Sequence, residues 1–192
     1  MFFELRTYDL KPGKAPVYLD FFRTFGVSRV TRHLPMIGYW QVESGRLNRI
    51  EHLWAYDSFE ERDACRAGLL SETEWMVDFV PKAFADVVAQ ESRILRLDEG
   101  SDLLSRVVER RKTAHPDQTS DAPMFARGLH ALSLGENIHE AGECLGAFTV
   151  LSGPAPGTRV TLATGSFERL CTYAPGIVSH EILRPLHLSP LQ

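Results

Sequence analysis

One predicted strand, over residues 49–56, carries the residue types best suited to chemistry. Side chains two positions apart share a face of a strand, so His52, Trp54 and Tyr56 are expected to lie side by side. Imidazole, indole and phenol groups form a mostly apolar wall with polar tips, which suits an apolar or aromatic ligand. His52 is therefore the candidate catalytic residue, as a general base or hydrogen-bond donor, and Trp54 and Tyr56 are candidate ligand-binding residues.

A second candidate group lies near the N-terminus, in a predicted strand over residues 2–10. Its polar face carries Glu4, Arg6 and Tyr8. Arg6 can bind a carboxylate or enolate through its planar guanidinium group, with Tyr8 as a further donor, so both are candidate ligand-binding residues.

Both groups have a purely structural alternative. The aromatic side chains around His52 can belong to the core, with His52 hydrogen-bonded inside it. Arg6 can form a cross-strand ion pair on a solvated or dimer-facing sheet. Arg62 and Arg66, one helical turn apart and flanked by acidic residues, indicate a solvated helix surface.

Motifs for metals and cofactors are missing from the sequence. The seven histidines match no zinc spacing, and the nearest approach, the segment 139–143, indicates a polar loop. There is no glycine-rich phosphate-binding motif and no serine- or cysteine-centred nucleophile signature. The sequence therefore predicts no cofactor and no metal.

The elements that position these groups follow a β-α-β-β-α-β order. Strand patterns cover 2–10, 37–43, 49–56 and 91–97, and helical patterns cover 14–26, 58–67 and 71–85. We expect Gly26 to end the first helix, Ser58 and Ser71 to cap the next two, and Pro81 to kink or shorten the third. This order is that of a ferredoxin-like unit, of the α+β class.

The second half of the chain resembles the first. The run 37–45 matches the run 145–153, which begins 108 positions further along, with Gly, Val, Ser and Gly identical. Without a gap, the same offset carries 58–60 onto 166–168. More weakly, 5–10 resembles 129–134, and 94–96 recurs as 182–184. The self-similarity predicts two tandem ferredoxin-like units that form a barrel, the second copy reduced.

This repeat predicts the domain organisation: a first unit over 1–98, a linker over 99–123 and a degenerate second unit over 124–192. On the ungapped offset His52 falls on Val160 and Trp54 on Leu162. Because the polar aromatic face is absent from the second copy, we expect any pocket chemistry in the first.

Composition bounds the partners. The chain has 192 residues and a net charge of −4, with 44% hydrophobic residues. This balance argues against a nucleic-acid or anionic-membrane partner, since both usually require a basic excess. Three widely spaced cysteines and an N-terminus without a targeting pattern predict a cytoplasmic protein.

Two long strings resemble motifs of the NIPSNAP family: the opening run 3–13, and the residues around Gly38, Trp40 and 52–56 with Arg62 and Arg66. The resemblance covers about residues 2–97. It implies a dimeric α+β barrel, a superfamily whose barrels form between subunits or between tandem repeats, so a homodimer is possible. It implies no agreed reaction; other branches include cofactor-free monooxygenases, haem-degrading enzymes and isomerases.

Two functions therefore stay open. The first is binding of a small apolar or aromatic molecule, with cofactor-free oxidation or isomerisation as its catalytic form. The second is a non-enzymatic binding or scaffold protein. A barrel interior filled completely by side chains, with no cavity, would favour the second function and contradict the first.

Overall fold

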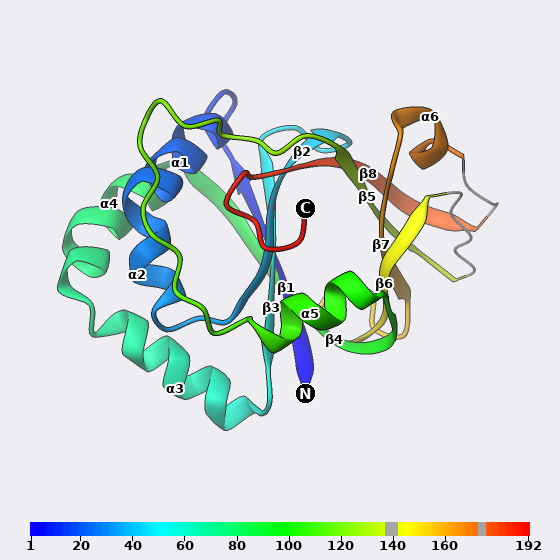
Figure 1. Ribbon diagram of the computed structural model, residues 1–192, viewed down its shortest axis with the longest axis horizontal. Helices are drawn as coiled ribbons and strands as arrows, with labels where there is room; N and C mark the ends of the chain where they lie inside the picture. The colour runs from blue at the N-terminus through cyan, green and yellow to red at the C-terminus, as the bar shows by residue number, and fades with distance from the viewer. Residues whose placement is uncertain (137–141, 173–175) are drawn as a thin grey trace.

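An antiparallel barrel of eight strands forms the centre of the computed structural model, which describes residues 1–136, 142–172 and 176–192 (Figure 1). Around the barrel the strands follow the order β1-β3-β2-β8-β5-β7-β6-β4. Their bounds are β1 Phe2–Leu10, β2 Met36–Ser44, β3 Arg49–Tyr56, β4 Val87–Gly100, β5 Leu129–Gly135, β6 Glu143–Ser152, β7 Arg159–Gly165 and β8 Ile177–Pro185.

The barrel closes within one chain. At one junction β2 pairs with β8, with Val42 opposite Leu183, and at the other β4 pairs with β6, with Leu97 opposite Phe148. The mixed α+β class expected from the sequence is confirmed, and every strand predicted for the first half is present. The strand β4, expected over 91–97, is longer and extends from Val87 to Gly100.

Most of the helices lie on one side of the barrel, outside the strands of the first half (Figure 1). In the described part of the second half, one short helix accompanies the strands. The bounds are α1 Ala15–Phe21, η1 Phe22–Gly26, α2 Val27–Thr31, α3 Phe59–Leu70, η2 Trp75–Phe79, α4 Val80–Ala83, η3 Phe84–Asp86, α5 Asp102–Glu109 and α6 Phe167–Leu170.

Side chains fill the interior of the barrel. All eight strands contribute apolar residues to it, among them Leu5, Trp40, Leu53, Phe148 and Leu183. The gap left between them measures about 10 Å³, which is at the lower limit for one water molecule. The barrel therefore offers a packed core and no room for a ligand among these residues.

The first helical segment continues past Gly26, so the expectation that Gly26 ends it is wrong. The chain runs through the π-helix η1 directly into α2. A Cβ at Gly26 would lie 2.7 Å from the Phe79 ring, which is fully buried. Glycine is thus needed at position 26 because η1 packs closely against η2, and not because the helix ends there.

Replacing Gly26 with alanine is expected to reduce the free energy of unfolding by about 1–3 kcal/mol, since the buried Phe79 ring cannot move away. Gly68→Ala is a matched control, because its added Cβ would meet the partly exposed His33 side chain, which can rotate. Urea unfolding of both variants measures the difference. Equal stability of the two variants would contradict this explanation.

Two helix-terminus predictions have different outcomes. Ser58 caps α3 as expected, with its hydroxyl accepting from the Glu61 N–H. The prediction for Ser71 is wrong, because its hydroxyl donates to the Gly68 carbonyl at the end of the same helix. Pro81 lies in the first turn of α4, where a missing N–H costs nothing, directly after a π-helical turn.

The ungapped alignment of the two halves fails at the second hairpin. Trp40 pairs with Glu51 in the first hairpin, whereas its counterpart Phe148 pairs with Val160 in the second. The second loop is therefore one residue longer, and the position equivalent to His52 is Thr161, not Val160. Val160 lies inside the barrel. The expected conclusion still holds, since Thr161 also lacks an aromatic ring.

The connection between the halves crosses the helices of the first half (Figure 1). Arg23, which is only 4% exposed, donates to the carbonyl oxygens of Thr119, Ser120 and Ala122. The polar loop predicted around His139 lies partly outside the described residues. Within the described ranges, no helix has the length and apolar character needed to cross a membrane.

Candidate functional site

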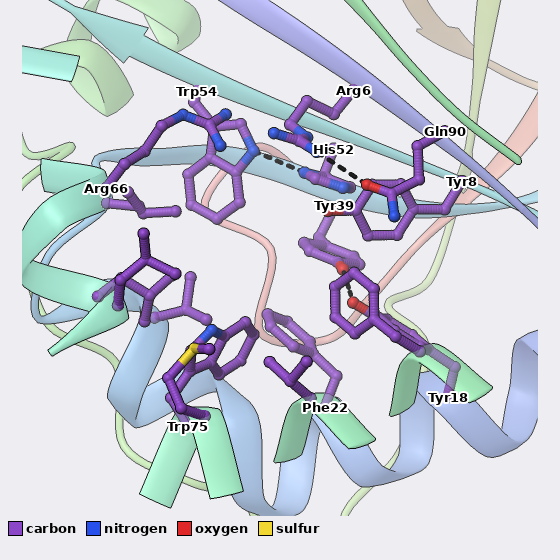
Figure 2. Close-up of a pocket in the computed structure, with 17 residues that line it drawn as sticks. Arg6, Tyr8, Tyr18, Phe22, Tyr39, His52, Trp54, Arg66, Trp75 and Gln90 are labelled. Carbon is purple, nitrogen blue, oxygen red and sulfur yellow. Dashed lines mark hydrogen bonds between the residues drawn. The ribbon is translucent and has the colours of Figure 1, made fainter. Parts of the chain in front are cut away.

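A cavity of about 320 Å³ lies between the outer face of the first-half strands and the helices that cover it (Figure 2). Its walls come from the strands β1–β4 and from each helical segment between α1 and η3. The lining residues are Arg6, Tyr8, Tyr18, Phe22, Val30, Leu34, Tyr39, His52, Trp54, Arg66, Leu69, Leu70, Trp75, Met76, Val80, Phe84 and Gln90.

Strand alternation brings most of the predicted site residues together. Arg6 and Tyr8 point outward from β1 and His52 and Trp54 from β3, and Arg6 lies directly opposite His52 in the ladder. Tyr56 shares their face, but it does not line the cavity. It is fully buried beside Phe2, with 5.7 Å between the two ring centroids.

His52 is held firmly at the cavity wall. Its ring stacks on Tyr39 at 4.8 Å and meets Tyr8 edge-on. The Trp54 Nε1–H donates to Nδ1 of His52 over 2.6 Å, so Nδ1 is unprotonated and the neutral ring carries its proton on Nε2. Burial, followed by the nearby Arg6 charge, holds the pKa of His52 well below its usual range.

The hydrogen bonding of His52 bears on the two roles expected for it. A general base needs a free ring nitrogen, but Nδ1 already accepts from Trp54. The Nε2 atom is buried and has no hydrogen-bond partner. The acceptor nitrogen of His52 is therefore already occupied, and its other nitrogen carries the ring proton. The alternative of a core histidine expects both ring nitrogens to be hydrogen-bonded, and the described residues pair only Nδ1.

Arg6 lies beside His52 and is tied to the neighbouring strand. Its Nη2 donates to Oε1 of Gln90 over 3.0 Å, and its guanidinium carbon lies 5.4 Å from the centre of the Tyr8 ring. The solvated cross-strand ion pair expected as an alternative is absent from this arrangement. The nearest Glu4 oxygen is 3.9 Å from Nη1, and only 16% of the Arg6 side chain is exposed.

Glu4 anchors a buried charge cluster behind this wall. Its carboxylate, which is fully buried, accepts from Arg62 at 2.9 and 3.1 Å, from Arg66 at 2.8 and 2.9 Å, and from the Ser92 hydroxyl at 2.7 Å. Burial alone would raise the pKa of Glu4, but the arginine hydrogen bonds lower it to about 2. The prediction that Arg62 and Arg66 form a solvated surface is wrong.

Aromatic rings from both the strands and the helices form much of the remaining cavity wall. Tyr39 donates its hydroxyl proton to the Tyr18 hydroxyl over 3.2 Å, and Trp75 stacks on Phe79 at 4.3 Å. Burial raises the pKa values of Tyr8, Tyr18 and Tyr39, so all three stay neutral at physiological pH. Figure 2 shows Trp75 and Phe22 facing Arg6 and His52 across the open centre.

Sequence reasoning missed the helical contributors to the cavity, among them Phe22, Arg66 and Trp75. The spacing of Tyr18 and Phe22 did indicate an apolar helix face, but not a cavity beside it. Among the described residues, no cluster of three or more histidine, cysteine or acidic side chains is arranged to hold a metal ion.

The fold and the cavity together define an α+β barrel protein with a pocket large enough for a small molecule. The crystal structure of an anthrone oxidase-like protein has the same fold, with a TM-score of 0.57 over 97% of this chain and 91% of that chain. The two sequences are only 6% identical, so the likeness concerns the fold alone.

The chain belongs to the NIPSNAP family, whose family model matches residues 3–101. Mouse NipSnap homolog 3B is 43% identical over 97 residues, and human NipSnap homolog 3A is 39% identical over 98 residues. Each match covers 50% of this chain and 39% of the relative. The chain thus spans well under half of the length of these relatives.

A crystal structure of a protein from Agrobacterium tumefaciens is 34% identical, with a TM-score of 0.48, and the match covers 53% of this chain and 95% of that chain. Every residue that lines the cavity falls between Arg6 and Gln90, inside the stretch that matches the family model.

Proposed function

We propose that this chain binds a small apolar or aromatic molecule in the cavity between the first-half strands and their helices. The observation that carries the proposal is the cavity itself. Its volume of about 320 Å³ falls within the usual range for small-molecule sites. Aromatic and aliphatic side chains form most of the wall, and the charged groups gather on one side (Figure 2).

The proposal locates the ligand outside the barrel. The sequence argument took a filled barrel interior as support for a non-enzymatic protein and as evidence against small-molecule binding, and the interior is filled. That finding counts against a site in the barrel core, but it does not bear on the outer cavity. Binding without turnover is consistent with both the filled barrel interior and the open outer cavity.

Cofactor-free oxidation or isomerisation is the catalytic form of the proposal. The cavity-lining residues that the structure describes include no carboxylate, and His52 already uses Nδ1 as an acceptor. In a reaction here, the His52 Nε2–H and the Arg6 guanidinium would stabilise an enolate oxygen. Because the described lining offers no base, the ligand would have to lose its proton to solvent before it binds. These features favour binding over catalysis as the function of the pocket.

The tandem architecture is part of the same proposal. The first half has the strand order β4-β1-β3-β2, and the second has the equivalent order β8-β5-β7-β6. Two ferredoxin-like units, over 1–98 and 124–192 with a linker over 99–123, account for this symmetry. The outward positions Ala131, Ser133, Thr161 and Ala163 are small, which supports a second unit that completes the barrel without a pocket of its own.

A cavity-filling variant tests the proposed function. Val80 lines the cavity, whereas Val77, three residues earlier, is 63% exposed and points away from it. We expect the wild type and Val77→Trp to retain the same apolar metabolite from a cell extract, and Val80→Trp to lose it. Mass spectrometry of the washed proteins measures retention, and circular dichroism checks the fold.

Two results would overturn this proposal. If folded Val80→Trp retained the metabolite as well as the wild type, the ligand would lie elsewhere. If the wild type enriched no small molecule, the scaffold alternative would be favoured.

A further inference from the structure

Three buried hydrogen-bond donors on the cavity-lining residues have no acceptor among the residues that the structure describes. They are Nε of Arg6, Nε of Arg66 and Nε2 of His52. Arginine remains protonated at physiological pH, and the Trp54 hydrogen bond fixes the His52 proton on Nε2. Leaving such donors unpaired costs about 1–3 kcal/mol each. The residues on this part of the wall therefore carry more donors than the protein supplies acceptors for, and a ligand with acceptor oxygens matches that excess.

The same side of the cavity has an excess of positive charge. Arg6, Arg62 and Arg66 surround a single buried carboxylate, that of Glu4. Arg62 occupies both Glu4 oxygens through two of its nitrogens, and Arg66 shares them through Nη2 alone. The other nearby acid, Asp63, is 75% exposed and lies against Arg62. In the described parts of the chain, Arg6 therefore has no carboxylate of its own within hydrogen-bond distance.

The remaining walls offer an apolar body a place to pack. Tyr39, Trp54 and Trp75 present ring faces or edges to the cavity, and the Tyr18 and Tyr39 hydroxyls already bond to each other. Leu70 and Met76, which also line the cavity, are 61% and 39% exposed and lie toward its opening. The polar preference of the site is thus concentrated around Arg6, Arg66 and His52.

We infer that the ligand is a small organic acid with an aromatic or apolar body, whose carboxylate binds Arg6 and Arg66 and accepts from His52. A carboxylate provides two acceptor oxygens and one negative charge, which matches the guanidinium groups in both geometry and sign. This inference rests on the proposed function, because it assumes that the cavity holds a small molecule.

Matched pairs of acids and amides test the inference. The probes are 2-naphthoate with 2-naphthamide and decanoate with decanamide, measured by calorimetry against the folded full chain. We expect at least one acid to bind about 10-fold more tightly than its amide. Arg6→Gln is expected to weaken acid binding about 10-fold and amide binding by clearly less, while Arg6→Lys loses less acid binding because it keeps the charge.

Arg96→Gln is the matched control, since Arg96 is 60% exposed, pairs with Asp98 and lies outside the cavity. Equal affinity of the acids and their amides would overturn the inference and leave the proposed function standing. If neither member of either pair bound, both the inference and the proposed function would be contradicted. Thermal melts of each variant separate loss of binding from loss of fold.

Discussion

Replacing Glu4 with glutamine is expected to reduce the free energy of unfolding by about 3 kcal/mol at pH 7. Glu4 is fully buried and is the only carboxylate within hydrogen-bond distance of both Arg62 and Arg66 among the described residues. Glutamine keeps the shape but removes the charge, so the mostly buried guanidinium groups face each other uncompensated. Urea unfolding at pH 7 measures the loss.

The effect of Glu4 also depends on pH with a definite sign. The pKa of Glu4 falls from 4.5 to about 2 on folding. Its stabilising contribution is therefore complete above about pH 4.5 and is lost as the pH falls toward 2. The difference in stability between wild type and Glu4→Gln should accordingly be largest at pH 7 and should shrink below pH 4.5.

A more exposed ion pair provides the control for this prediction. Glu91, whose side chain is 42% exposed, pairs with Arg93, two residues further along the same strand, β4. Glu91→Gln should change stability by less than about 1 kcal/mol. The account of the cluster would be wrong if Glu4→Gln were as stable as Glu91→Gln at pH 7, or if its deficit did not change between pH 7 and pH 3.

The strands of the first half could be predicted from the sequence because their signal is local. Alternation along residues 49–56 correctly put His52 and Trp54 on one face, and this required no knowledge of the rest of the chain. The same argument grouped Tyr56 with them. What alternation cannot show is how far along the strand the cavity extends, which depends on the helices packed above it.

The charge cluster was missed because its partners are far apart in the sequence. Arg62 and Arg66 have acidic neighbours, which made a solvated surface the simpler interpretation. Their actual partner, Glu4, lies 58 and 62 residues away. One signal was available. Glu4 lies on the same strand face as Arg6 and Tyr8, and a helix with two arginines one turn apart could neutralise its charge.

The error in the repeat alignment has a different origin. A loop accepts one extra residue at little cost, so sequence identity on its two sides does not fix a common offset. Strand pairing does fix it, because a shift by one residue moves each side chain to the opposite face. Val160 was matched to an outward residue by the offset, whereas its ladder position points into the barrel.

Replacing Glu51 with glutamine is expected to stabilise the protein, and more strongly as the pH rises. Glu51 is buried in the barrel core, where its Oε2 accepts a hydrogen bond from the Thr7 hydroxyl over 2.7 Å. Burial raises its pKa, the Thr7 hydrogen bond opposes this, and Glu181 raises it further, to about 8. The folded protein therefore retains a proton that the unfolded chain releases above about pH 4.5.

The sign of the effect follows from this difference in bound protons. Between about pH 4.5 and pH 8 the folded state binds more protons than the unfolded state, so Glu51 lowers stability by about 1.4 kcal/mol per pH unit. Buried histidines act in the opposite sense; the pKa of His130, for example, is lowered by burial to about 4. The difference between variant and wild type isolates Glu51, because the histidines are common to both.

Chemical unfolding at pH 5 and pH 7.5 provides the measurement. Glu51→Gln should match the wild type closely at pH 5 and exceed it by at least about 2 kcal/mol at pH 7.5. Glu99→Gln, at a position 72% exposed on the barrel surface, should show no such divergence. A constant difference between Glu51→Gln and wild type at both pH values would mean that Glu51 is ionised in the folded barrel, with Arg49 and Arg93 outweighing its burial.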